Sequence, residues 1–596
     1  MCGIVGFVDK KHQLVQSQLR SVTKKMITII EHRGRDGHGV FIDEMNGVAF
    51  GHARLSILDL STAAAQPFKT KDSTAVLIYN GEIYNFSELK KELSSSFNFR
   101  SSGDTEVLLR GWQKWGKGVL NRTKGMYAFG LFEPAQHTLF LALDRFGIKP
   151  LYVYEDANWF AFSSEIKAFF CLPGVEAELA TEHLSEYFTY RWVAGENTLF
   201  KKIKRLEPAT YLTFNTCTFR SQQKKYYEIK KIPVPAQAEV CESELIRLLE
   251  NSVQQHLIAD VPVGLQLSGG VDSSLIASIA IQQKKTNLHS FSIGIKRPGW
   301  NEFKYSRLVA KKLGTIHHEL YFDENDFCAL LPELTYHMDE PINHLHSVPM
   351  YLLSKEARKH VTVLMSGEGA DEIFFGYKRY MGLTQKKSLT PHDIIHSNQF
   401  GDPKLLAKVL IPYTDTDKER SRFIQGKPRN FETILGYDMM TYLVPLLMRQ
   451  DKMGMAATIE NRVPFLDHEL VEFAYNLPLS VKVSSQEAKI ILKKVANRFL
   501  PKEIIYRPKV GFGLPQSDWL RHKDGLGRYL RFFTDRIITP RAYLNYPELQ
   551  RMIAAHQTKK VDYGQLLWIM IAYELWAQIF IDGVSPAEIV HSLKNK

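Results

Sequence analysis

At 596 residues the chain is longer than a single hydrophobic core usually supports, so we expect at least two domains. Its 44% hydrophobic and 23% charged residues, with 37 Gly and 25 Pro, exclude a disordered, collagen-like or disulfide-scaffold protein. The formal charge of +12 does not predict a nucleic-acid partner, because the basic residues are dispersed in pairs such as Lys10-Lys11 rather than clustered.

The first half of the chain predicts a β-rich layer with few helices. Short apolar runs at 75–79 and 138–142 have strand composition, and turn residues follow them, Asn80-Gly81 after the first run. A polar stretch with two prolines at 215–239 predicts a linker. We therefore expect one domain over 1–214 and a second over 240–596.

In the second domain the pattern changes to alternating strands and helices. We predict strands at 261–267, 288–293, 318–322 and 361–365, and helices at 274–280 and 305–313. This alternation favours an open parallel sheet covered on both faces, and longer helical patterns fill the last third of the chain.

The five cysteines are scattered without CxxC spacing or a Cys/His cluster, so neither zinc nor a disulfide framework is expected. The N-terminus lacks a signal-peptide pattern, and the apolar stretch 566–581 is interrupted by Glu574 and Gln578. We expect a cytoplasmic protein without a membrane span.

Cys2 is a candidate nucleophile because it follows the initiator Met. Removal of Met1 would leave one residue with both a thiol and a free α-amine, and an amine that titrates near neutral pH can take the thiol proton. A lone cysteine is more often a small buried hydrophobic residue, so the interpretation depends on the motifs that follow.

Four motifs accompany the segment that begins at Cys2; they are His32-Arg-Gly-Arg-Asp36, Gly51-His-Ala-Arg-Leu-Ser-Ile57, Asn80-Gly-Glu-Ile-Tyr-Asn85 and Gly103-Asp-Thr-Glu106. In this order they resemble the class II glutamine amidotransferases over roughly the first 200 residues. The resemblance implies an N-terminal-nucleophile fold, in which two β-sheets lie between helix layers. Where that family usually has Pro, this chain has Arg35, which we expect to alter the loop over the glutamine pocket.

The same resemblance implies roles for five residues. Arg54 would hold the α-carboxylate of glutamine, Glu82 and Asp104 its α-amine, and Asn80 with Gly81 would form the oxyanion hole. A guanidinium suits a carboxylate, and an amide donor beside an unobstructed backbone N–H suits a tetrahedral intermediate. Taken singly, Asn-Gly is usually a turn, an Arg a surface charge and an Asp a helix cap.

A second motif, at 267–274, lies between a predicted strand and a predicted helix and has the composition of a pyrophosphate-binding loop. Glycines allow close backbone approach, and backbone N–H groups and hydroxyls can donate to an anion. The loop lacks the Lys of a Walker A motif, which disfavours γ-phosphoryl transfer. The candidate ATP-binding residues are Leu267, Ser268, Gly269, Gly270, Asp272 and Ser273, together with Ser366 and Gly367 from the second loop.

That second glycine-rich, acidic loop, 366–372, follows a predicted strand and contains Glu368, a candidate substrate-binding residue. Asp272 and Asp371 are the candidate Mg²⁺ ligands, since carboxylate oxygens suit this ion. The two loops resemble those of asparagine synthetases, and the motifs at 451–455, 460–467 and 507–512 extend the resemblance almost to the C-terminus.

The resemblance to asparagine synthetases implies that Lys489 stabilises the α-phosphorus as pyrophosphate leaves. Tyr377 and Glu460 match positions that form an acid/base pair in the related β-lactam synthetases. Without the resemblance, Lys489 would be interpreted as an exposed helix lysine.

We therefore predict an α/β and α+β protein that is a glutamine-dependent amide ligase. Glutamine supplies ammonia through an internal tunnel, and ATP adenylates a carboxylate, aspartate being favoured. Amidation of a sugar acid or other cell-envelope carboxylate is the alternative, because Asn343-His344 stands where the family commonly has Ala-Asp. The other hypotheses are β-lactam synthetase chemistry, tRNA modification and the role of a non-catalytic regulator. A homodimer is compatible with the sequence.

Overall fold

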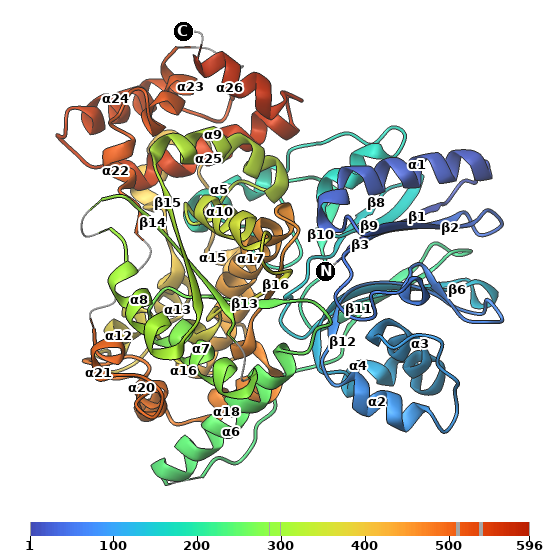
Figure 1. Cartoon of the computed structure of the whole chain (residues 1–596). Helices are drawn as coiled ribbons and strands as arrows, with labels where there is room; N and C mark the ends of the chain where they lie inside the picture. The colour runs from blue at the N-terminus through green and yellow to red at the C-terminus, as the bar shows by residue number, and fades with distance from the viewer. Residues whose placement is uncertain are drawn as a thin grey trace.

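The structure is a computed structural model of the chain. It describes residues 2–235, 237–284, 287–297, 300–507, 513–535 and 540–594, and the backbone only of Lys594. The motif at 507–512 lies outside the described residues except for Arg507. The N-terminal part forms two stacked sheets beside a larger, mainly helical part (Figure 1).

The first sheet of the N-terminal part is six-stranded, with strand order β10-β8-β9-β1-β3-β2. Its strands are β1 (Gly3–Asp9), β2 (Gly37–Asp43), β3 (Val48–Arg54), β8 (Tyr152–Glu155), β9 (Trp159–Ser163) and β10 (Ile203–Arg205). The second sheet has the order β12-β11-β7-β6-β5-β4 and contains β4 (Phe68–Lys69), β5 (Val76–Ile83), β6 (Gly125–Glu133), β7 (Thr138–Leu143), β11 (Thr210–Asn215) and β12 (Ser221–Lys225).

Helices cover the outer faces of both sheets (Figure 1). These are α1 (Gln16–Ile29) on the first sheet, α2 (Phe86–Leu93), α3 (Asp104–Trp115) and α4 (Val119–Arg122) on the second, and α5 (Leu184–Tyr190) at the boundary with the rest of the chain. The aromatic side chains of Phe50, Phe160 and Phe162 fill the space between the sheets. The predicted arrangement of two sheets between helix layers is confirmed, but the expectation of few helices was wrong.

The predicted turn at Asn80-Gly81 is wrong, because both residues lie inside β5. The antiparallel pairing of β5 with β6 continues from Val76 opposite Phe132 to Ile83 opposite Gly125. A Cβ on Gly81 would lie 2.2 Å from the Met126 carbonyl oxygen, so the close approach of the two strands requires glycine here.

The range that we expect to be a linker, 215–239, contains β12, whose strand pairing with β11 joins it to the second sheet. The domain boundary itself stays a prediction. Beyond it the chain forms the predicted parallel sheet, with strand order β15-β14-β13-β16-β17. Its strands are β13 (Val263–Gln266), β14 (His289–Ile295), β15 (Ile316–Phe322), β16 (Val363–Met365) and β17 (Glu460–Arg462), the last of which the sequence did not reveal.

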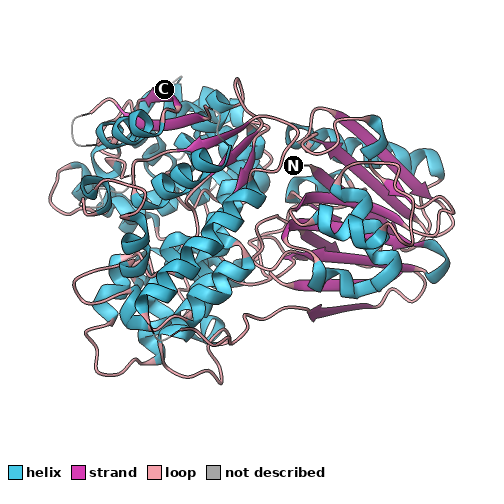
Figure 2. Ribbon diagram, turned by 60° about the horizontal axis from the view of Figure 1, so that its bottom comes forward, coloured by secondary structure: helices cyan, strands magenta, loops and turns pink. Residues whose placement is uncertain are grey.

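Helices surround this sheet and form most of the remaining chain (Figure 2). The helices up to β16 are α6 (Ala238–His256), α7 (Val271–Lys284), α8 (Phe303–Leu313), α9 (Glu324–Met338) and α10 (Ser347–Ala357). Between β16 and β17 lie α11 (Ala370–Ile373), α12 (Lys378–Leu383), α13 (Pro391–Ile395), α14 (Pro403–Val409), α15 (Asp417–Ser421), α16 (Phe431–Asp438), the π-helix η8 (Met439–Leu443) and α17 (Val444–Ala456).

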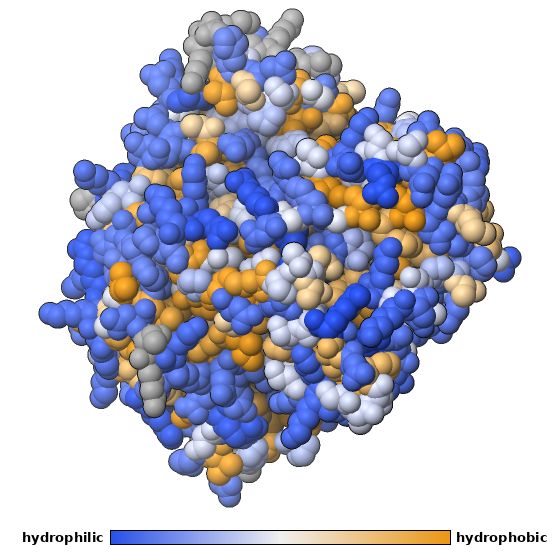
Figure 3. Space-filling view, turned by 45° about the vertical axis from the view of Figure 1, so that its right-hand side comes forward, coloured by the Kyte–Doolittle hydropathy of each residue, from blue (hydrophilic) through white to orange (hydrophobic). Residues whose placement is uncertain are grey.

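After β17 come α18 (His468–Asn476), α19 (Leu479–Lys482), α20 (Ile490–Ala496), α21 (Lys502–Ile505), α22 (Gln516–Trp519), α23 (Arg531–Thr534), α24 (Tyr546–Gln557), α25 (Gly564–Phe580) and α26 (Pro586–Lys594). The apolar stretch at 566–581 falls mostly in α25, where Trp568 and Trp576 are fully buried in the core. No helix among the described residues is both long and apolar enough to cross a membrane. Hydrophilic residues cover most of the face shown in Figure 3, between smaller apolar areas.

Two candidate active sites

The first site is built around Cys2, immediately before β1 and buried between the two halves of the chain. Its backbone nitrogen donates a hydrogen bond to Asn80 Oδ1 at 2.9 Å, and its Sγ lies 3.8 Å from the Leu55 carbonyl oxygen. Burial raises the pKa of the Cys2 thiol. The thiol is therefore mainly protonated at neutral pH and needs a base to become a nucleophile.

Asn80 is placed by β5 so that its amide faces Cys2. The Oδ1 atom is occupied by the Cys2 nitrogen, whereas Nδ2 is buried and has no hydrogen-bond partner among the described residues. A buried N–H donor without an acceptor is costly unless a ligand supplies one. The arrangement can therefore donate to an oxyanion that forms beside the thiol.

The predicted glutamine ligands gather near this thiol. Arg54, at the end of β3, donates to the carbonyl oxygens of Ser61 (2.8 Å) and Asp59 (2.5 Å), which fix its guanidinium. Asp104, the first residue of α3, accepts hydrogen bonds from the Tyr79 hydroxyl and the Ile83 N–H. Burial raises the pKa of Asp104 to about 6, although both of these donors act to lower it.

Glu82 is buried between Asp104 and an acidic residue of the second half, Glu460. Burial, together with these two carboxylates, raises the pKa of Glu82 well above its usual value. Arg462 joins the cluster across the domain boundary, 2.6 Å from Glu460 and 3.6 Å from Glu82. Burial acts to raise the pKa of Glu460, yet cations that include Arg462 and Lys149 lower it to about 2.

The sequence interpretation missed the role of Arg33, which is fully buried beneath Cys2. Its Nε donates to the Cys2 carbonyl oxygen at 3.2 Å, Nη1 lies 3.0 Å from Glu165, and Nη2 lies 2.8 Å from Asp451 on α17. Arg33 and Asp451 each belong to a motif already singled out in the sequence. The motifs alone did not indicate this link between the two halves, because the two residues are 418 positions apart.

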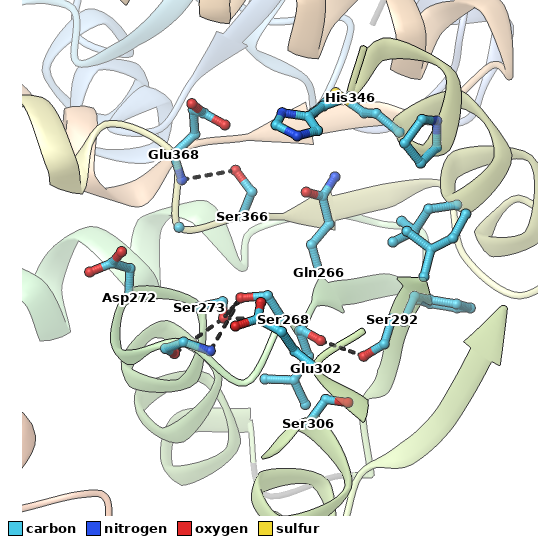
Figure 4. Close-up of a pocket in the computed structure, with 18 of the residues that line it drawn as sticks. Gln266, Ser268, Asp272, Ser273, Ser292, Glu302, Ser306, His346, Ser366 and Glu368 are labelled. Carbon is cyan, nitrogen blue, oxygen red and sulfur yellow. Dashed lines mark hydrogen bonds between the residues drawn. The ribbon is translucent and has the colours of Figure 1, made fainter. Parts of the chain in front are cut away.

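The second site is a cavity of about 360 Å³ at the carboxyl ends of β13 and β16 (Figure 4). Its wall includes the loop at 267–273, where the Ser268 and Ser273 hydroxyls are 3.0 Å apart. Gly269 has φ of +72°, and a Cβ there would lie 2.5 Å from the Ser306 nitrogen. The loop at 366–372 packs closely against the loop at 267–273, since a Cβ on Gly367 would lie 2.8 Å from the Ser273 nitrogen.

Lys489 joins the two loops. Its Nζ lies 2.6 Å from Asp272 Oδ2 and 2.7 Å from Asp371 Oδ1, and these two carboxylates raise the pKa of its ammonium group against the effect of burial. Lys489 has a left-handed backbone (φ of +57°) at the start of α20. A Cβ on Gly376 would meet Asp371 Oδ1 at 2.0 Å and Lys489 Cε at 2.1 Å, so this close approach needs glycine.

The predicted pairing of Tyr377 with Glu460 is not formed. The structure places Glu460 at the first site, whereas the Tyr377 hydroxyl donates to Glu372 Oε1 at 2.5 Å. Burial, reinforced by Glu368 and Asp371, raises the pKa of Glu372 to about 8. Glu372 ends the second glycine-rich, acidic loop, and the sequence alone indicated no role for it.

Of the remaining predicted residues, Glu368 lines the cavity and lies 3.3 Å from Arg449 Nη2. Leu267, Gly270, Ser366, Asp272 and Asp371 also line it. Arg35, the departure from the family pattern, is exposed on the surface. The structure thus brings the candidate residues together in two groups, one around Cys2 and one around Lys489.

The buried N-terminal thiol and the two-loop cavity define a glutamine-dependent amidotransferase with a second, ATP-using site. Residues 244–578 match the asparagine synthase family model, and residues 1–227 match the glutamine amidotransferase domain model. The chain belongs to the asparagine synthase family.

Similar proteins in three bacteria cover most of the chain. Asparagine synthetase [glutamine-hydrolyzing] 1 of Bacillus subtilis is 31% identical, over 100% of this chain and 99% of the relative. A putative asparagine synthetase [glutamine-hydrolyzing] of Mycobacterium tuberculosis is 30% identical over 98% of both chains. Asparagine synthetase B [glutamine-hydrolyzing] of Escherichia coli is 29% identical, over 86% of this chain and 82% of the relative.

Proposed function

We propose that the first site releases ammonia from glutamine by covalent catalysis at Cys2. Once Met1 is removed, the Cys2 α-amine takes the thiol proton and the thiolate attacks the glutamine amide carbon. Asn80 Nδ2 and the Gly81 N–H stabilise the oxyanion, while Arg54 and Asp104 hold the two ends of the amino acid. Ammonia leaves, and water then releases glutamate from the thioester.

At the second site, a carboxylate oxygen of the acceptor attacks the α-phosphorus of ATP and pyrophosphate leaves, giving an acyl-adenylate. Ammonia then attacks the acyl carbon and AMP leaves, so that an amide forms. The observation that carries this proposal is Lys489, which Asp272 and Asp371 hold between the two loops. A buried cation fixed beside a phosphate-binding loop can stabilise charge that develops on a departing phosphate.

The same carboxylates fit a magnesium ion. Asp272 Oδ1 is buried and has no hydrogen-bond partner among the described residues, so it offers a hard oxygen ligand. Asp371 pairs with the same lysine, Lys489, and so lies close to Asp272. Bound with ATP, the ion would neutralise phosphate charge. Lys489 pairs with both carboxylates and so holds them beside the two loops.

We propose aspartate as the acceptor, with asparagine as product, and a cytoplasmic location as in the sequence analysis. The support is the family, since the Bacillus subtilis and Escherichia coli relatives named above carry the name asparagine synthetase. The second candidate is a sugar acid. It is favoured by Asn343 and His344, which stand where the family commonly has Ala-Asp. The carboxylate of that Asp, which would pair with an ammonium group on the acceptor, is therefore missing from this chain.

A screen of AMP release tests the proposal. Purified enzyme with ATP, magnesium and glutamine is given aspartate, glutamate, a uronic acid or no acceptor, and AMP and amide are both quantified. We expect AMP and asparagine in equal amounts with aspartate alone. Turnover with the uronic acid and not with aspartate would show that the acceptor is a sugar acid. Formation of ADP would contradict the adenylation chemistry.

A further inference from the structure

Three histidines from distant parts of the sequence meet on one face of the parallel sheet. His289 begins β14, and His318 lies in β15, the strand that pairs with β14 (Figure 1). His360 lies in the turn between α10 and β16. Each of the three offers one ring nitrogen, and these nitrogens lie within 4.8 Å of one another. Their spacing in the sequence gives no metal-binding motif, since 29 positions separate His289 from His318.

The backbone of two strands and one turn fixes the positions of these side chains. Successive side chains of a strand point to opposite faces, and the ring of His317 is hydrogen-bonded to the Ser290 hydroxyl at 2.8 Å on one face. The next residue, His318, therefore lies on the other face, as does His289. The N–H of His360 donates to the carbonyl oxygen of the last residue of α10 at 2.9 Å, which holds this turn over the sheet.

The three rings are close enough for their nitrogens to share one ion. His289 Nδ1 lies 2.8 Å from His318 Nε2 and the ring centres are 5.1 Å apart, so these two rings meet nitrogen to nitrogen. The ring centre of His360 lies 4.3 Å from that of His318 and 5.0 Å from that of His289. Two nitrogens bound to one tetrahedral ion at about 2.0–2.1 Å are roughly 3.3 Å apart. Small rotations of the rings reach this separation.

The cluster of three histidines is separate from the ATP cavity and accessible to solvent. None of the three lines the cavity; Phe291, which does, places its ring 4.8 Å from that of His318. His360 is exposed and the other two histidines are half-buried, so an ion can enter from solvent and keep a bound water. Lys359, next to His360, pairs with Glu356 at 2.6 Å, which reduces its repulsion of a cation.

We propose that His289, His318 and His360 bind one divalent transition-metal ion of the zinc type through their ring nitrogens, with water as the fourth ligand. Imidazole nitrogens suit zinc, copper and nickel, whereas magnesium prefers oxygen, so this ion is distinct from the magnesium proposed for ATP. In the hydrogen bond between His289 and His318 one ring carries its proton on the facing nitrogen. On coordination that proton moves through solvent to the other nitrogen of the same ring, which stays neutral.

The test measures zinc binding to the full chain without an affinity tag, after treatment with a chelator. Magnesium in excess occupies oxygen-ligand sites, and titration calorimetry gives the affinity and the stoichiometry. The variants are His289→Gln, His318→Gln and His360→Gln, and His38→Gln is the matched control, an exposed histidine of β2 in the N-terminal half. Circular dichroism verifies the fold of each variant. Because His360 is exposed, its replacement tests the site even where a strand variant fails to fold.

We expect one zinc ion per chain with a Kd of about 1 µM or tighter. Each of the three variants should weaken this binding at least roughly 100-fold, because altering a group that merely supports a metal ligand already costs about 10- to 100-fold. Zinc at 100-fold above its Kd should also raise the midpoint of thermal unfolding by roughly 2–4 °C in the unaltered chain and not in the three variants. The control His38→Gln should stay within about twofold of the unaltered chain.

Cobalt(II) as a second probe distinguishes imidazole from thiolate ligands. Its visible absorption reports tetrahedral coordination, and a bound thiolate adds a near-ultraviolet band. We expect the visible absorption without the thiolate band, and its loss in His360→Gln. Zinc binding that is equal in all four variants, a thiolate band that marks a cysteine as the ligand, or no zinc binding at 100-fold above the expected Kd would each overturn the proposed metal site. None of these results depends on whether the chain makes an amide.

Discussion

The two sites differ in how their polar groups are arranged. Around Cys2 the groups are buried and mutually bonded, from Asn80 to the Arg33 network. The second site is a cavity of about 360 Å³ whose two loops are joined by one lysine that lies between two carboxylates. The first site is proposed to hold glutamine alone, whereas the second must hold ATP and the acceptor together and therefore needs a larger cavity.

The largest expected effect separates the two sites completely. Cys2→Ala should lower glutamine-dependent amide formation at least roughly 1000-fold, because it removes the only group proposed to attack the amide. Ammonium-dependent formation should stay within about twofold of the unaltered chain. Amide formation is measured with each nitrogen source, and equal loss with both would mean that the sites are not separate.

The converse substitution is Lys489→Met, which removes the cation between Asp272 and Asp371. Amide formation from either nitrogen source should fall roughly 100- to 1000-fold, the cost of losing one stabilising group in an electrostatic site. Glutamate release in the same sample serves as the control and should persist. A synthase rate within tenfold of normal would show that Lys489 has only a structural role.

The Arg33 network predicts an effect on stability rather than on one reaction. Arg33→Met leaves Glu165 and Asp451 with fewer partners in a buried setting, and the free energy of unfolding should fall by about 3 kcal/mol. Lys231→Met is the matched control, since Lys231 pairs with Glu432 on the surface, and it should cost less than about 1 kcal/mol. Chemical denaturation measures both, and equal effects would contradict a buried link between the halves.

The smallest effect concerns pH. Burial raises the pKa of Asp104 to about 6, so the carboxylate that is proposed to hold the glutamine ammonium group is lost as pH falls through 6. The KM for glutamine should rise roughly tenfold between pH 7 and pH 5, measured by glutamate release. In Asp104→Asn the KM should be high and independent of pH; a rise that persists in this variant would assign the titration to another group.

Much of both sites could be predicted because each motif occupies a short stretch of sequence. Gly270, Asp272 and Asp371 line the cavity, Gly269 forms the tight turn of its loop, and Cys2 lies beside Asn80, as their motifs indicated. Contacts between distant segments could not be read in this way. The pairing of Arg33 with Asp451 spans 418 residues, and β17 joins its sheet only after a long helical insertion.

The structure differs from the sequence-based prediction at two places where the pairing of distant strands outweighs the local sequence pattern. Asn80-Gly81 is a common turn sequence, but β6 and the buried faces of β5 keep it in a strand. The resemblance to β-lactam synthetases pairs Glu460 with Tyr377, yet Glu460 lies in β17 at the first site, where it pairs with Arg462. In both cases the outcome depends on strands that the sequence alone does not bring together.

The central claim is that this chain activates a carboxylate by adenylation and then amidates it. The direct test supplies aspartate labelled with ¹⁸O in its carboxylates, together with ATP, magnesium and ¹⁵N-amide glutamine, and analyses the products by mass spectrometry. Because the attacking oxygen stays with the phosphorus, the account predicts one ¹⁸O in each AMP and one ¹⁵N in each asparagine. AMP without ¹⁸O, or labelled oxygen in inorganic phosphate beside ADP, would contradict it.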